Sequence, residues 1–219
     1  MPKKTKQDSE NTRQVLLDAA AALFIHQGIA KTTLSDIAAQ AGLTRGAVYW
    51  HFSNKEDIIR LLWERNAGEL HHTFLEQLSE IRSSNHPDLA FRDAITGLMR
   101  RVANQPAAGL AIRIMMHCVE FTGEQADLRR FLRSRRNELQ GAIHRALMYL
   151  EQQHLLRAQL SLKLQAQCLM SYLFGLVHQH LEPGHHPLHL ARDGEAMLEL
   201  LLDSILPVEP SQHPDSTGR

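Results

Sequence analysis

Apolar side chains recur along this chain at intervals of three and four residues, in segments that end at glycine, proline or short polar clusters. This period is typical of amphipathic helices, and the strict alternation that marks half-buried strands is missing from the sequence. The pattern therefore predicts an all-α protein of about nine helices. Their expected ranges are 9–26, 34–41, 45–51, 54–81, 88–104, 106–121, 124–153, 161–181 and 190–206.

The predicted helices fall into two groups that differ in size. Three helices within residues 10–55 are expected to form a small N-terminal domain, which the long helix of residues 54–81 joins to the rest. Residues 56–207 supply six helices for a second, larger domain. Residues 1–9 are expected to be a flexible basic arm, and the proline-containing residues 208–219 a disordered tail.

The stretch from Thr32 to Lys55 has the organisation of a helix-turn-helix. Its two short predicted helices flank Gly42-Leu43-Thr44, a connection of the length and composition that this motif uses. Thr33 and Thr44 can cap the two helices, because a threonine hydroxyl accepts a hydrogen bond from a free N–H group of the first turn. A helix that begins at Thr44 also points its free N–H groups outward, which favours a phosphate.

The four consecutive rings from Tyr49 to Phe52 cannot all face one core, because successive helical residues point in different directions around the axis. With Val48 and Phe52 buried, the outer side of the second helix would carry Arg45, Gly46, Tyr49 and Trp50. Such a surface suits a DNA major groove, where arginine bonds guanine and rings contact the thymine methyl group. The less specific alternative is a three-helix module with core aromatic residues and no DNA.

The residues themselves resemble a known family. Lys31-Thr32-Thr33, Asp36-Ile37-Ala38, Ala41-Gly42 and the run TRGAVYWHFSNK of residues 44–55 are similar to the N-terminal domain of TetR-family transcriptional repressors. The variant with Arg-Gly-Ala-Val-Tyr-Trp-His-Phe behind a Lys-Thr-Lys arm resembles the AcrR-like branch, which controls multidrug efflux pumps. The similarity covers about residues 9–65. The residues that it implies for DNA contact are Thr33, Thr44, Arg45, Gly46, Tyr49, Trp50, His51 and Lys55.

The resemblance further implies a homodimeric repressor that binds a palindromic operator in double-stranded DNA and leaves it when a small, drug-like inducer binds. Family members pair through the last two long helices, so the expected interface residues are Leu169, Leu173, Leu176, Leu198, Leu201 and Leu202. Methionine and phenylalanine, interleaved with polar groups, suit a permissive ligand pocket, although ordinary helix packing is the alternative for each of them. The expected pocket residues are Met99, Met115, Met116, Phe121, Gln140, His144, Phe174 and His178.

The overall composition is ordinary for a globular protein, but the charges are distributed unevenly along the chain. Lys and Arg number 24 and so do Asp and Glu, which excludes a polybasic, histone-like protein. Residues 1–55 nonetheless carry seven basic and four acidic side chains, whereas residues 137–219 carry five and nine. A locally basic N-terminal module therefore remains compatible with DNA. A further basic run, either a solvated face or a site for an acidic or anionic partner, consists of Arg129, Arg130, Arg133, Arg135 and Arg136.

Histidines and cysteines leave a second regulator hypothesis open, a metal- or redox-sensing protein on the same scaffold. Metal sites need fixed geometry and usually sulfur or regularly spaced ligands, whereas loop histidines are commonly solvated and buried thiols inert. We therefore expect no metal and no cofactor. The residues that this hypothesis would use are His178, His180, His185, His186 and His189 around a helix connection, with Cys118 and Cys168.

Other classes of protein find little support in the sequence. It contains no glycine-rich phosphate loop, nucleophile elbow or catalytic Cys/His pattern, so we predict no catalytic residue and no enzyme. No apolar run reaches the roughly 18 residues of a membrane span, and polar residues follow the N-terminal lysines where a signal peptide needs an apolar run. With two cysteines and no disulfide framework, the expected location is the cytoplasm.

Overall fold

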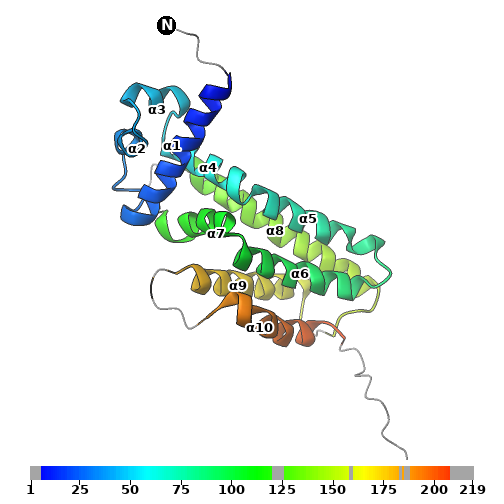
Figure 1. Cartoon of the computed structure of the whole chain (residues 1–219). Helices are drawn as coiled ribbons and strands as arrows, with labels where there is room; N and C mark the ends of the chain where they lie inside the picture. Colours follow the sequence, from blue (N-terminus) through cyan, green and yellow to red (C-terminus); the bar gives the residue numbers. More distant parts are fainter. Residues whose placement is uncertain (1–5, 120–125, 158–159, 183, 185–187, 208–219) are drawn as a thin grey trace, which may run out of the picture.

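The computed structural model describes residues 6–119, 126–157, 160–182, 184 and 188–207 of the chain. Over these residues the chain forms ten α-helices and two short helical turns, and no strand (Figure 1). None of the described helices is long and apolar enough to cross a lipid bilayer. The elements are α1 (Lys6–Gln27), α2 (Leu34–Gln40), α3 (Arg45–His51), α4 (Lys55–Asn66), α5 (Gly68–Glu80), the 3-10 turn η1 (Ile81–Ser83), α6 (Pro87–Asn104), α7 (Pro106–Arg113), the π-turn η2 (Ile114–Cys118), α8 (Ala126–Gln152), α9 (Leu162–Leu181) and α10 (Leu190–Ile205).

Local signals set the ends of the first helices as the sequence predicts. The Thr33 hydroxyl accepts a hydrogen bond from the Asp36 N–H at 3.1 Å, and the Asp36 carboxylate accepts one from the Thr33 N–H at 2.8 Å. This reciprocal pair is a capping box, and Thr44 caps α3 through the Ala47 N–H at 3.3 Å. Gly28 and Gly42, with φ of 81° and 67°, follow α1 and α2 in the left-handed conformation that glycine adopts without steric cost.

The predicted flexible arm of residues 1–9 is wrong for its last four residues, since α1 begins at Lys6. Polar side chains extend the helix beyond its apolar stripe through hydrogen bonds between residues four apart. Gln7 donates to the Asn11 side chain at 3.1 Å, and the Thr12 hydroxyl donates to the Asp8 carbonyl at 2.7 Å. Residues 1–5 and the predicted tail 208–219 lie outside the described residues.

The single helix predicted for residues 54–81 is two helices, α4 and α5, which accounts for ten helices where nine were expected. Ala67 leaves the helical region with φ −125° and ψ −9°, and it is completely buried where the chain turns. Gly68 follows it, a residue whose freedom in the unfolded chain makes a continuous helix less favourable. The two helices can therefore pack at different angles against their neighbours.

Two hydrophobic cores organise the molecule. Helices α1 to α3 form the head at one end of Figure 1, α5 to α10 form the body, and α4 lies between them. The core of the head, around Phe24, Phe52 and Ile58, also includes Ile114 of η2 and Leu128 of α8. The head is thus packed directly on two elements of the body.

Candidate DNA interface and ligand cavity

Helix α3 divides its side chains between the core and the solvent as the sequence predicts. Val48 and Phe52 are buried, whereas Tyr49 is 48 % exposed and Trp50 is 74 % exposed. The Arg45 guanidinium lies 5.5 Å from the centre of the Tyr49 ring, so a cation–π contact already orients it. In Figure 1, α3 lies at the edge of the head that faces away from the body.

Gly46 is exposed on this helix, and the fold does not require its small size. A Cβ atom at this position would meet only the Thr44 hydroxyl, at an ordinary 3.9 Å. Glycine inside a helix costs about 0.5–1 kcal/mol relative to alanine. The gap that it leaves on the surface of α3 therefore has no explanation within the protomer.

Lys55 has a structural role that sequence reasoning missed. Its ammonium donates hydrogen bonds to the carbonyl oxygens of Ile29 at 2.6 Å and Ala30 at 3.4 Å, and so ties the start of α4 to the connection after α1. Partial burial lowers the pKa of this ammonium below its ordinary value. Since no local pattern links Lys55 to Ile29, the contact could not be read from the sequence.

The capping box at Thr33 is expected to make the stability of the head depend on pH. Hydrogen bonds from the Thr33 N–H and hydroxyl hold the pKa of the exposed Asp36 carboxyl below its ordinary 3.8. The folded state therefore binds this proton more weakly than the unfolded state, so the stabilisation is complete above pH 3.8 and is lost as the pH falls through the folded pKa. Asp36→Ala should lower the melting temperature at about pH 7, and the difference from the wild type should shrink as the pH falls below 3.8. A difference that does not change with pH would contradict this origin.

The body contains a cavity of about 600 Å³ among α4 to α9. Four of the predicted pocket residues line it: Met99, Met115, Met116 and Phe174. Its walls are otherwise mostly apolar, with one imidazole and four guanidinium groups. The remaining lining residues are Trp63, Leu70, His71, Phe74, Leu98, Val102, Ile112, Arg129, Leu132, Arg133, Arg135, Arg136, Leu139, Met170, Leu173 and Val177.

Three other predicted pocket residues lie elsewhere. Gln140 and His144 line a separate cavity of about 320 Å³ beside Lys163 and Ala166, because their face of α8 points toward the start of α9. His178 is exposed, and its ring lies 4.3 Å from that of His117. Phe121 falls outside the described residues.

Sequence reasoning also missed residues of the large cavity. Trp63 belongs to α4 and His71 to α5, which the sequence predicts as one continuous helix. The sequence therefore contained no indication that both side chains line the same cavity. The arginines of α8 could have been found from their spacing. Arg129, Arg133 and Arg136 are four and three residues apart, so they share one face of the helix, and that face lines the cavity.

The leucines predicted for a dimer interface face the interior of the protomer. Leu169, Leu173, Leu176, Leu198 and Leu202 are each at most 4 % exposed, and Leu201 packs partly buried against the same core. These stripes are therefore core, because a side chain enclosed by its own protomer cannot reach a partner. Two exposed leucines lie on the opposite sides of these helices, Leu164 of α9 at 47 % and Leu200 of α10 at 77 % exposure.

The metal and redox hypothesis gains no support from the described part of the chain. Within it, no three His, Cys, Asp or Glu side chains gather as metal ligands would, and His185 and His186 lie outside it. Cys118 and Cys168 are both free thiols. Burial raises the pKa of the Cys118 thiol, which makes it less reactive.

Comparison with known proteins agrees with this geometry. Residues 16–62 match the family model of bacterial regulatory proteins, tetR family. The chain is 32 % identical over 181 residues to the HTH-type transcriptional regulator AcrR of Shigella flexneri, which covers 83 % of each chain. NalD of Pseudomonas aeruginosa, the secondary repressor of the MexAB-OprM multidrug efflux pump, has a similar structure with a TM-score of 0.81 and 25 % identity, covering 93 % of this chain and all of NalD. The triclosan complex of SmeT, the repressor of the Stenotrophomonas maltophilia pump SmeDEF, superimposes with a TM-score of 0.72 and 27 % identity over 95 % of this chain and all of SmeT.

Proposed function

The chain belongs to the TetR family of bacterial regulatory proteins, and from this premise we propose that it is a ligand-responsive repressor of a multidrug efflux pump operon. It binds a palindromic operator as a homodimer and releases it when a small molecule occupies the 600 Å³ cavity. The pump assignment is supported by NalD and SmeT, which repress multidrug efflux pumps. The observation that carries the proposal is that two side chains, Met115 and Leu132, line the cavity and also pack against the core of the head.

Helix α3 is the recognition helix in this proposal. Its exposed Arg45 and Tyr49 contact base edges in the major groove, and the gap at Gly46 lets the DNA backbone or a base approach the helix closely. The capped start of α2 lies against a phosphate. The complete proposed contact set is Thr33, Thr44, Arg45, Gly46, Tyr49, Trp50, His51 and Lys55. The Lys55 ammonium has three N–H donors, so it keeps its bonds to the Ile29 and Ala30 carbonyls and donates the third to a phosphate.

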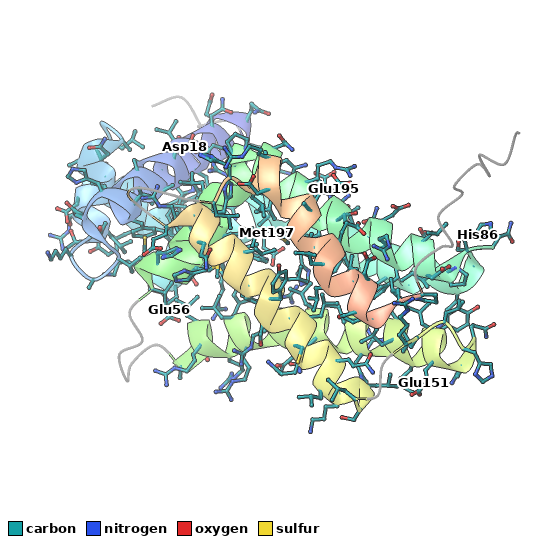
Figure 2. All side chains as sticks on the ribbon, turned by 90° about the horizontal axis from the view of Figure 1, so that it is seen from below. Asp18, Glu56, His86, Glu151, Glu195 and Met197 are labelled. Carbon is teal, nitrogen blue, oxygen red and sulfur yellow. The ribbon has the colours of Figure 1, made fainter. Side chains whose placement is uncertain are left out.

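A second copy of the chain covers the outer face of α9 and α10, which consists of Leu164, Cys168, Ser171, Ala196 and Leu200. In Figure 2 these two helices lie side by side in front of the rest of the body, with α9 in yellow and α10 in orange. The residues from α9 follow one another at spacings of four and three, and each residue of the set is exposed. The pairing places two recognition helices on one side of the DNA, and half-sites one helical turn apart require that arrangement.

Ligand binding reaches the head through residues that belong to both sites. Met115 and Leu132 line the cavity and also pack against the core of the head, where Ile114 and Leu128 are completely buried. Trp63 lines the cavity from α4, which joins head and body. A ligand that displaces these side chains favours a different position of the head, so the two recognition helices no longer match the half-site spacing.

Selection of binding sites from random duplex DNA by the purified full-length protein tests this function. We expect a palindrome with half-site centres about 10 base pairs, or a multiple, apart. Affinity for it should fall steeply with salt, because each phosphate contact releases counterions. Addition of triclosan, which forms a complex with SmeT, or of efflux-pump substrates should release the operator. Failure to enrich any sequence, or an affinity that does not change with salt, would refute the proposal.

A further inference from the structure

The large cavity has one strongly basic side. Arg129, Arg133, Arg135 and Arg136 line it, and no aspartate or glutamate stands among its lining residues in the described part of the chain. All four belong to the first half of α8 and form what we term the basic wall. The remaining lining is apolar apart from His71 and the indole N–H of Trp63.

The stability of the fold does not explain Arg133 and Arg136. They are three residues apart on one helix, where side chains are neighbours and like charges repel. Arg135 makes a cation–π contact and an ion pair within α8. Its guanidinium lies 5.4 Å from the centre of the Phe131 ring and 3.3 Å from the Glu138 carboxylate. Arg133 and Arg136, by contrast, are exposed and have no carboxylate within 4.0 Å among the described residues. Two uncompensated positive charges therefore stand at the edge of an apolar space.

Two side chains of the same lining, Trp63 and Arg135, also carry hydrogen-bond donors that lack an acceptor in the described part of the chain. The indole N–H of Trp63 and the Nε–H of Arg135 are both enclosed, and neither has an acceptor among the described residues. A buried donor without an acceptor costs free energy, so native proteins rarely leave one unpaired. Both atoms are closed off by protein atoms, however, and the same unpaired Nε–H occurs outside the cavity in Arg60, Arg101 and Arg113. The class of ligand therefore follows from the exposed charges of Arg133 and Arg136.

We propose that the inducers of this protein are amphipathic anions, with an acyl chain or ring system in the apolar part of the cavity and a carboxylate facing Arg133 and Arg136. Guanidinium groups recognise a carboxylate through charge-assisted and bidentate hydrogen bonds. A cation finds no carboxylate in the described lining and meets the exposed guanidinium groups of Arg133 and Arg136 instead. The proposal rests on the proposed function and specifies the chemical class of its ligand.

Three twelve-carbon compounds with different head groups test the charge selectivity: dodecanoate, dodecanol and dodecyltrimethylammonium, each below its micelle concentration. In full-length protein carrying Trp50→Phe, the fluorescence of the one remaining tryptophan, Trp63, reports occupation of the cavity without DNA. We expect dodecanoate to bind on the order of tenfold more tightly than dodecanol, and the cation to bind most weakly. Dodecanoate should also release the selected operator from the wild-type protein.

Variants of the basic wall give the matched comparison. Arg133→Gln with Arg136→Gln should remove the preference for dodecanoate and leave the affinity for dodecanol unchanged. Arg133→Glu with Arg136→Glu should reverse the preference in favour of the cation. The control is Arg130→Gln, since Arg130 lies on the same helix, pairs with Asp127 at 3.3 Å and does not line the cavity. Thermal unfolding confirms that each variant is folded.

The outcomes separate this inference from the proposed function. Equal binding of dodecanoate and dodecanol, no response of Trp63 to dodecanoate, or an unchanged preference in the double variants would each overturn it. Release of the operator by neutral compounds alone would overturn the anionic inducer and leave the repressor function intact. The titrations contain no DNA, so failure to find an operator would refute the proposed function without affecting the test of the cavity.

Discussion

Replacing Tyr49 by alanine is expected to weaken operator binding by the dimer by at least about 30-fold while the protomer stays folded. The ring is half exposed on α3, so its loss removes little from the core. It also supports the Arg45 guanidinium at 5.5 Å, and without it arginine loses part of its orientation toward the bases. A good base contact contributes about 1–3 kcal/mol, and a dimer loses it at both half-sites.

Titration of the selected operator with wild type and Tyr49→Ala measures this effect, with the melting temperature recorded for both. Val15→Ala is the control, because Val15 is an apolar head residue on α1 with a similar exposure of 47 %. Its operator affinity should match the wild type. If Tyr49→Ala binds as tightly as the wild type, then α3 is not the recognition helix.

Leu200→Glu is expected to convert the dimer into monomers and to abolish tight operator binding with it. Leu200 is 77 % exposed in the protomer, the largest exposure of any large apolar side chain in the described residues. In a two-fold interface the substitution buries two carboxylates without partners. An uncompensated buried charge costs about 3–5 kcal/mol, which weakens association at least about 100-fold. A monomer retains one recognition helix and therefore one half-site.

Sedimentation equilibrium of wild type and Leu200→Glu over a range of concentrations measures the dissociation constant directly. Met148→Glu is the matched control, since Met148 is 41 % exposed on α8 and does not belong to the outer face of α9 and α10 as defined above. It should remain dimeric and bind the operator. A dimeric Leu200→Glu protein would show that a second copy does not cover this face.

The head could be predicted closely because its signals are local. Thr33, Thr44 and the two glycines at 28 and 42 act on N–H groups and dihedral angles within a few residues, so their effect is independent of distant parts of the chain. The division of α3 into a buried and an exposed side follows from the helical period alone. The body lacks such signals, and its predicted residues were placed with much less success.

The large cavity shows why the pocket residues of the body could not be predicted reliably from the sequence. Met115 and Met116 line it with Phe174, but Gln140 and His144, chosen by the same reasoning about mixed polar and apolar helices, open onto another space. Composition identifies side chains that can line a pocket. Which of them do so depends on the angles between helices, and these angles depend on contacts between residues far apart in the sequence.

The sequence by itself determined that this protein is all-helical, where most helices begin and end, and which helix of the head presents Arg45 and Tyr49 to solvent. Only the tertiary structure decided that α4 and α5 separate at Ala67, that the leucine stripes of α9 and α10 face inward, and that arginines of α8 border an apolar cavity. The physical reason is that a hydrophobic stripe shows that a helix face is buried and does not show what buries it. A neighbouring helix, a second copy or a ligand satisfies the same periodicity, and only the packing of the whole chain distinguishes them.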